Sequence, residues 1–347
     1  MKTIDINKFL QYSSKIPVID VRSPAEFEKG HIPNAINIPI FDNAERAIIG
    51  TRYKQNGKEA AVFSAFDIVA PKMKKLVLNA KQVAKNNKLL LHCWRGGLRS
   101  KNMAWLFSSI DIDCYVLDGG YKAYRKMIRE ELGEKIEIII LGGMTGSGKT
   151  DILHELQKKG EQMLDLEALS NHKGSVFGAL GQNEQPTNEQ FENNIHEKWN
   201  KLDKSNRIWI EDESYKIGTN CIPETLYHQM RNTNVLKINI QKDIRVKRLI
   251  KEYALFDKKF IENSIRKIDR RLGGQNTEQA ISALQNDNYK EVASILLDYY
   301  DKAYLHGLSK RDESLIENIL IENDDPDYTA NILINKANNM VEAKIIG

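Results

Sequence analysis

The feature that most constrains the fold of this chain is a β-branched run that leads directly into a glycine-rich loop. Lys135–Gly143 has the composition of a buried strand, and Gly143–Thr150 satisfies the pattern G-x-x-x-x-G-K-[ST] in full. Asp151–Lys158 follows with the apolar spacing of a helix. The glycines let backbone N–H groups wrap a phosphate, and Lys149 supplies a positive charge. This order predicts a P-loop α/β domain whose ligand carries a phosphate chain.

The candidate phosphate-binding residues all belong to this loop. They are Gly143, Thr145, Gly146, Ser147, Gly148, Lys149 and Thr150, and the Thr150 hydroxyl is also a candidate Mg²⁺ ligand. In P-loop proteins an acidic residue that follows a neighbouring strand completes the site. Asp165 and Asp212 both follow apolar strand candidates, and the sequence leaves the choice between them open.

The second half of the chain also contains strand and helix candidates. After the P-loop, Glu161–Leu166, Arg207–Asp212 and Val235–Ile240 read as strands. From about Asp243 to the end the sequence is highly charged and is expected to be mainly helical. Gly133 breaks the chain before the P-loop strand, so we expect one domain over residues 1–132 and a P-loop domain over residues 133–347.

The first 132 residues also alternate strand and helix signals. The strand candidates are Ile16–Val21, Ala35–Ile40, Lys88–Cys93 and Cys114–Gly120, and the helix candidates are Pro24–Lys29, Lys72–Lys85, Ser100–Ser108 and Tyr121–Leu132. Such alternation implies a parallel sheet covered by helices on both faces. The polar stretch from Phe41 to about Gly57 is longer than a minimal connection, which makes it a candidate active-site insertion.

One cysteine lies where a strand runs into a glycine-containing loop. In LLLHCWRGGLRS, Cys93 ends the strand, and a helix follows the loop. Inward-turned backbone N–H groups and the positive end of that helix would stabilise an anion, and a thiolate as well. Cys93 is therefore the candidate catalytic nucleophile. The candidate anion-binding residues around it are Trp94, Arg95, Gly96, Gly97, Leu98 and Arg99.

The surrounding sequence resembles the rhodanese family. DVRSPAEFEKGHIPNAINIP, residues 20–39, looks like the N-terminal signature of that family. The resemblance implies that Cys93 carries a transferred chalcogen atom as a persulfide or its selenium equivalent. The loop is longer than in common sulfur-transferring rhodaneses, and His92-Cys93-x5-Arg99-Ser100 also matches the cysteine phosphatase pattern. The loop alone leaves a phosphatase reading open.

The combination of the two loops resembles the tRNA 2-selenouridine synthase family, in which a rhodanese domain is fused to a P-loop domain. The matching segments are Gly50–Ala61, Cys93–Ser100, Gly142–Thr150, Asp165–Gly178, Glu211–Gly218 and Leu296–Tyr304. The resemblance implies an α/β fold: a rhodanese-like parallel sheet domain, then a P-loop NTPase-like α/β domain with a helical C-terminal region.

The resemblance also implies a transferase reaction in two stages. Geranyl diphosphate first S-geranylates the 2-thiouridine at the tRNA wobble position, and selenophosphate then displaces the geranylthio group to leave 2-selenouridine. No tightly bound cofactor is implied beyond Mg²⁺ at the P-loop. The alternatives are a P-loop kinase or NTPase with a sulfur-relay rhodanese domain, and a redox- or phosphate-sensing module in which Cys93 is regulatory.

A protein that binds the anticodon region of a tRNA requires a basic surface that faces this region. The net charge of the whole chain is only +4, so the basic residues must be clustered. Helical spacing places two groups of cations in the C-terminal region on common faces. These candidate tRNA-binding residues are Arg245, Lys247, Arg248, Lys251, Arg266, Lys267, Arg270 and Arg271. The small-molecule donors are the other expected partners, together with an enzyme that produces selenophosphate.

Composition sets the remaining expectations. Cys93, Cys114 and Cys221 are the three cysteines, and their spacing matches neither a disulfide framework nor a metal site. No apolar run reaches the roughly 18 residues of a membrane span, and the N-terminus lacks a secretory signal. We therefore expect a cytoplasmic protein that does not associate with membranes.

Overall fold

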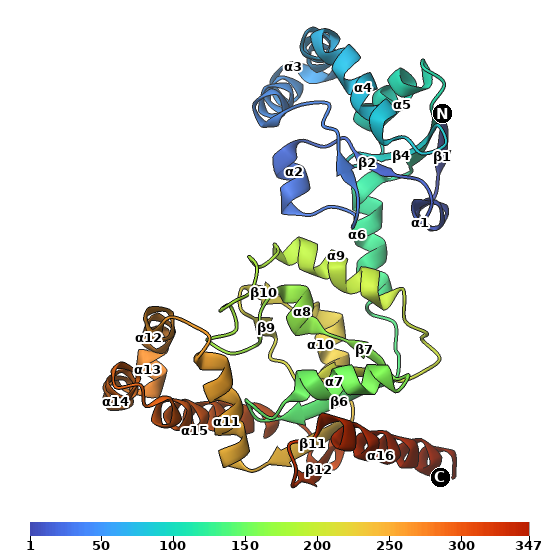
Figure 1. The fold of residues 1–347 in the computed structure, drawn as a ribbon. Coiled ribbons are helices and arrows are strands. Elements are labelled where there is room, and N and C mark those ends of the chain that lie inside the picture. The colour runs from blue at the N-terminus through green and yellow to red at the C-terminus, as the bar shows by residue number, and fades with distance from the viewer. Residues whose placement is uncertain (347) are drawn as a thin grey trace. The chain divides into compact units, whose positions relative to one another are not determined.

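The computed structural model describes residues 1–346, which form two compact units, Met1–Glu131 and a second that begins at Leu132 (Figure 1). Each unit contains a five-stranded sheet in which every neighbouring pair of strands is parallel. Helices separate most consecutive strands, as the alternating sequence pattern predicted. The α/β fold class is thus confirmed. No helix in the described part of the chain is long and apolar enough to cross a membrane.

The sheet of the first unit has the order β1-β5-β4-β2-β3. Its strands are β1 (Lys2–Ile4), β2 (Val18–Asp20), β3 (Ile36–Asn37), β4 (Lys88–His92) and β5 (Asp113–Leu117). The central strand β4 contains Leu89, Leu90 and Leu91, which are all fully buried. The sequence prediction missed β1, which has only three residues and pairs with the edge of β5.

The helices of the first unit are α1 (Ile6–Ser13), α2 (Pro24–Lys29), α3 (Asn43–Val69), a 3₁₀ turn η1 (Ala70–Lys72), α4 (Met73–Val83), α5 (Leu98–Ser108) and α6 (Gly120–Glu131). The polar stretch that starts at Phe41 forms the first half of α3. Asp42 and Glu45 start this helix with a reciprocal capping box. Gly57, at a φ of 83°, kinks it.

The sheet of the second unit has the order β12-β11-β6-β8-β7. Its strands are β6 (Ile138–Gly143), β7 (Gln162–Leu164), β8 (Ile208–Glu211), β11 (Val235–Ile240) and β12 (Ile316–Ile321). A short antiparallel hairpin joins β9 (Lys216–Ile217) to β10 (Asn220–Cys221). The P-loop strand β6 lies at the centre of the sheet, so its loop opens at the carboxyl ends of the strands, where ligands bind in open α/β sheets.

The helices of the second unit are α7 (Lys149–Lys158), α8 (Leu166–Ser170), α9 (Asn188–Trp199), α10 (Glu224–Arg231), α11 (Lys242–Tyr253), α12 (Lys258–Lys267), α13 (Asp269–Leu272), α14 (Gly274–Gln285), α15 (Tyr289–Leu308), a 3₁₀ turn η2 (Glu313–Leu315) and α16 (Pro326–Ile346). Helices α11, α12, α14 and α15 bury a shared apolar cluster.

The expectation of a mainly helical C-terminal region is confirmed by α11–α16, with an exception at Ile316–Ile321. This segment is β12, and each of its six residues pairs with β11. Ile319 and Ile321 are buried while Leu320 is 71% exposed, which is the alternation of a sheet-edge strand. Helices flank the segment on both sides, so pairing with a strand distant in sequence, and not local spacing, decides its conformation.

Candidate functional sites

The first site is built around Cys93, which directly follows β4 and is 3% exposed. Its Sγ atom accepts a hydrogen bond from Ser100 Oγ, in the first turns of α5, at 3.3 Å. Residues 94–97 form the loop between strand and helix. In the described part of the chain, no protein group accepts a hydrogen bond from their backbone N–H groups. These open donors and the N-terminus of α5 can stabilise an anion beside the thiol.

Two glycines allow this loop to close. Gly96 has a φ of 65°, and a Cβ at this position would lie 2.5 Å from Leu117 O. Gly120, at a φ of 61°, faces the loop from the β5–α6 turn, where a Cβ would lie 2.4 Å from both Cys93 O and Gly96 N. Any side chain at Gly120 would therefore displace the loop that presents Cys93.

The arginines of the loop have different surroundings. Arg99 pairs with Glu26 of α2, with N–O distances of 2.6 and 3.3 Å, so its charge holds α5 against α2. Burial of Glu26 would raise the pKa of its carboxyl, but the hydrogen bond and charge of Arg99 lower it overall. Arg95 and Trp94 are exposed on the loop, whereas Leu98 and Arg99 belong to the first turn of α5. Of the two arginines, Arg99 is held in an ion pair, and Arg95 remains available to an anionic ligand.

A buried group of polar side chains supports the strand beneath Cys93. Arg22 donates to Asp20 and, at 2.7 Å, to Gly30 O. Its guanidinium lies 3.9 Å from the centre of the Tyr121 ring. His92 is fully buried beside them, and burial lowers the pKa of its imidazole. Asp20, Arg22 and Gly30, which belong to the rhodanese-like signature, therefore act as scaffold.

The second site is the P-loop, between β6 and α7. Gly146 and Gly148 both have a φ of 77°, the left-handed conformation that lets the loop wrap an anion. The Thr150 hydroxyl donates to Glu211 Oε1 at 2.9 Å, and Lys149 Nζ lies 4.0 Å from Glu211 Oε2. Burial opposes the charge of Lys149, but the neighbouring carboxylates, Glu211 first among them, raise its pKa overall.

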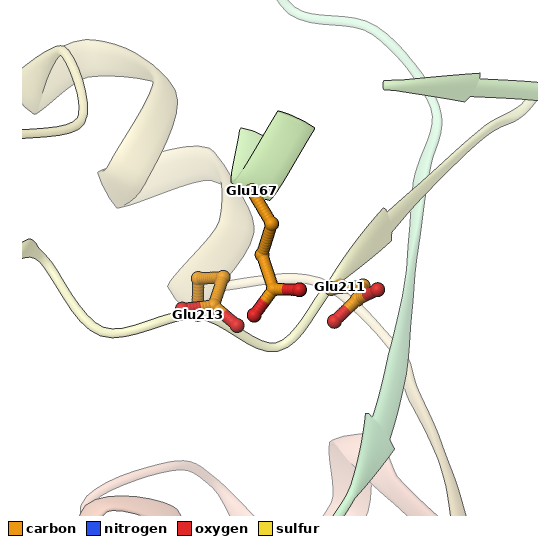
Figure 2. A group of neighbouring side chains, drawn as sticks. All are labelled: Glu167, Glu211 and Glu213. Atoms are coloured by element: carbon orange, nitrogen blue, oxygen red, sulfur yellow. The ribbon is translucent and has the colours of Figure 1, made fainter. Parts of the chain in front are cut away.

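Three carboxyl groups converge beside the P-loop (Figure 2). Glu167 lies in the first turn of α8, Glu211 ends β8, and Glu213 lies in the segment that follows. A carboxylate oxygen from each lies within 4.8 Å of the others. Gly174 lies against them, since a Cβ there would be 2.7 Å from Glu167 Oε1. We call these three residues the glutamate triad.

Crowding in the glutamate triad disfavours ionisation. Burial and the neighbouring carboxylates raise the pKa of Glu213 to about 8 and that of Glu167 to about 10. Burial also raises the pKa of Glu211, although Lys149 and the Thr150 hydroxyl oppose the shift. The triad therefore has a strong tendency to take up protons or another positive charge.

Neither of the two acidic candidates from the sequence is the acceptor for Thr150. Asp165 is the N-cap of α8 and accepts from Ala168 N at 2.8 Å. Asp212 accepts from Arg311 at 2.5 Å. The acceptor is Glu211, which points to the P-loop because successive residues at the end of a strand face opposite sides. The acidic cluster Glu211-Asp212-Glu213 was a visible signal, but strand register was needed to interpret it.

The structure corrects part of the predicted C-terminal tRNA footprint. Arg245 is 4% exposed; its guanidinium pairs with Asp301 at 2.7 Å and donates to Thr145 O of the P-loop. Arg248 pairs with Asp151 at 2.7 Å and packs against Gly148. Both arginines therefore support the P-loop and are not free to bind RNA. The remaining predicted residues are exposed, namely Lys247, Lys251, Arg266, Lys267, Arg270 and Arg271.

The other two cysteines have no catalytic surroundings. Burial raises the pKa of the Cys114 thiol to about 11, which keeps it in its neutral form. Cys221 lies in the short strand β10 and is half-buried. Both behave as small structural residues.

In comparisons with known proteins, each unit matches a family model. A family model described as the tRNA 2-selenouridine synthase AAA domain matches residues 136–324, and a rhodanese-like domain model matches residues 6–127. Curated tRNA 2-selenouridine synthases align along most of the chain. The protein of Shewanella frigidimarina is 34% identical over 86% of this chain and 90% of its own length. That of Bordetella petrii is 31% identical over 90% of this chain and 92% of its own length.

Proposed function

The chain belongs to the tRNA 2-selenouridine synthase family, and from this premise we propose that it converts wobble 2-thiouridine in tRNA to 2-selenouridine through an S-geranyl intermediate. Geranyl diphosphate and selenophosphate are the proposed co-substrates. The observation that carries the proposal is that one chain combines a cysteine beside an open anion loop with a P-loop backed by carboxylates. Each loop suits one of the two anionic donors.

The P-loop is the proposed site of the geranyl step. The sulfur of 2-thiouridine forms a bond to C1 of the geranyl group while the bond from C1 to the diphosphate oxygen breaks. The diphosphate leaves with the electron pair, so negative charge develops on it, and the base loses its N3 proton to water. Lys149 and the N–H groups of Gly146 and Gly148 stabilise that charge where it forms, whereas the N–H of Gly143 donates to the Tyr304 hydroxyl. Arg248, packed on Gly148 and paired with Asp151 and Asp324, supports the loop that holds these donors.

The donor set at the P-loop fits Mg²⁺. The hydroxyl of Thr150 and the carboxylates of the glutamate triad are hard oxygen donors, which Mg²⁺ prefers. The raised pKa values of Glu167 and Glu213 reflect negative charge that a divalent cation would neutralise. Bound Mg²⁺ would supply Lewis-acid stabilisation of the diphosphate. Thr150 and Glu211 are the residues placed to hold it.

The Cys93 loop is the proposed site of the selenium step. Alkylation makes C2 of the base electrophilic and turns its sulfur into part of a leaving group. The selenium of selenophosphate then bonds to C2, the C2–S bond breaks, and geranylthiolate departs with the electron pair. Water then attacks the phosphorus and the Se–P bond breaks, which releases phosphate and leaves 2-selenouridine. The open N–H groups of residues 94–97 suit the phosphate oxygens of selenophosphate, and Cys93 lies next to these donors, where its sulfur contacts the selenium that attacks C2. The ion pair between Arg99 and Glu26 disfavours the phosphatase alternative, in which that arginine must be free to bind phosphate.

The test is to incubate the protein with 2-thiouridine tRNA, geranyl diphosphate and selenophosphate, and to analyse digested nucleosides by mass spectrometry. Cys93→Ala should abolish 2-selenouridine and leave S-geranyl-2-thiouridine, whereas Lys149→Ala should suppress the geranyl step. Cys221→Ala, which removes a thiol from a short hairpin strand, is the matched control and should retain both products. Loss of both steps in the Cys93 variant would refute this division of labour. Turnover of ATP without RNA would instead favour a P-loop NTPase.

A further inference from the structure

The charge of the chain is divided unequally between the two units. Residues 1–131 contain 22 Lys and Arg against 13 Asp and Glu, whereas residues 132–347 contain 29 against 34. The basic residues of the first unit are further concentrated in residues 46–101, which hold 13 Lys and Arg but only two acids, Glu59 and Asp67. This segment runs from α3 through α4 and β4 to the Cys93 loop and the start of α5. We call it the basic segment.

Most cations of the basic segment are free. Arg46, Lys72 and Arg99 pair with acids of the first unit. The other ten are exposed and have no ion pair in the part of the chain that the structure describes: Arg52, Lys54, Lys58, Lys74, Lys75, Lys81, Lys85, Lys88, Arg95 and Lys101. Uncompensated cations repel one another, and binding of an anionic partner relieves that repulsion.

Exposed apolar side chains lie among these cations. Trp94 follows Cys93 directly and is 37% exposed, and Leu98 and Trp105 of α5 are 49% and 66% exposed. Leu98, Lys101 and Trp105 are spaced by three and four residues, so they share one face of α5. We call Trp94, Leu98 and Trp105, which include two exposed tryptophans, the aromatic stripe. From Leu98 to Trp105 it covers about 10 Å along α5, starting at the Cys93 loop. Helix α4, which carries Lys74, Lys75 and Lys81, packs against α5.

We propose that the basic segment and the aromatic stripe form an RNA-binding surface that delivers an unpaired loop of the polynucleotide to Cys93. The inference rests on the proposed function and names the part of the chain that recognises its tRNA substrate. Lysines of α3 and α4 bind phosphates, and the tryptophans stack on bases that have left the helical stack. An acidic protein partner would match the charge, but exposed tryptophans alternating with cations suit the flat faces and phosphates of a single strand better.

Two matched triple variants distinguish this surface from the C-terminal footprint. Lys74→Gln/Lys75→Gln/Lys81→Gln removes three free cations from the basic segment. Lys267→Gln/Arg270→Gln/Arg271→Gln removes three exposed cations from the second unit. Binding of bulk tRNA is measured by filter binding between 50 and 300 mM salt. Since each lost phosphate contact lowers the log–log salt slope by about 0.7–0.9, the first variant should lose about two units of slope and at least tenfold in affinity. The second, which removes part of the predicted C-terminal footprint, should lose less slope and less affinity than the first.

The stacking part is tested separately. Trp105→Ala should weaken tRNA binding by roughly 5- to 100-fold without changing the salt slope, and Trp105→Phe should restore most of it. Phe260→Ala, which truncates a similarly exposed aromatic residue of α12, is the control. Unchanged melting temperatures exclude misfolding, because all substituted side chains are exposed.

The inference is overturned if the second-unit triple variant weakens tRNA binding as much as the first, or if neither variant weakens it. It is also overturned if polyglutamate or anionic phosphatidylglycerol vesicles, and not tRNA, bind in a manner that depends on the basic segment. Its failure is separable from failure of the proposed function. A first-unit triple variant with an unchanged KM for tRNA in 2-selenouridine formation refutes the surface alone, whereas a wild type that binds tRNA but forms no 2-selenouridine refutes the function alone.

Discussion

Replacing Glu213 by glutamine should stabilise the ligand-free protein, and the gain should depend on pH. The carboxyl of Glu213 lies within 4.8 Å of those of Glu167 and Glu211, and burial and Glu211 raise its pKa from 4.5 to about 8. Between these two values the folded state binds more protons than the unfolded state. Stability is therefore lost as pH rises through this window. Glutamine has the same shape and no charge, so it removes this loss.

The magnitude follows from the size of the shift. At pH 7.5 three units separate the solution pH from the unfolded-state value of 4.5, which corresponds to at most about 4 kcal/mol. Solvent that reaches the half-buried carboxyl reduces the expected gain to about 2 kcal/mol. For a domain of this size, about 2 kcal/mol raises the melting temperature by roughly 4–8 °C. At pH 5, where Glu213 is protonated in the folded state, the gain should be close to zero.

The assay is calorimetric melting at pH 5 and pH 7.5 in the presence of EDTA. Glu184→Gln, an exposed glutamate of the same unit, is the control and should have no effect at either pH. Addition of Mg²⁺ should raise the melting temperature of the wild type more than that of Glu213→Gln, with release of protons into a weak buffer. Equal stabilisation at both pH values, or destabilisation at pH 7.5, would contradict the electrostatic reasoning.

Three further substitutions test the loops themselves. Gly120→Ala should destabilise the first unit by more than about 2 kcal/mol and abolish selenium transfer, because its Cβ would clash with Cys93 O; melting and nucleoside analysis check this. Arg245→Ala should cost about 3–5 kcal/mol in thermal unfolding of the second unit, since it leaves the Asp301 partner and a P-loop carbonyl without their donor. Glu211→Gln should slow geranyl transfer by roughly 10²-fold or more and weaken the Mg²⁺ dependence of that step, as single-turnover measurements would show.

The sequence by itself determined the features that are encoded within short contiguous segments. The P-loop from Gly143 to Thr150 and the Cys93 loop are each a strand, a turn and a helix in direct succession, so composition and spacing locate them. The boundaries of α2 and β11 agree with those predicted because their apolar periods and flanking residues act locally. Family membership also followed from these segments, since they occur in a fixed order along one chain.

Only the tertiary structure decided which distant residues meet. Glu167 and Glu213 are far apart in sequence, but the parallel sheet brings the carboxyl ends of their strands to one edge, and register then selects Glu211 over Asp212. Arg245 looked like part of an exposed basic helix face, yet packing turns it inward to Asp301. Strand β12 forms because β11 offers an unpaired edge. Each of these outcomes depends on long-range packing and pairing, whose energies are absent from any local window of sequence.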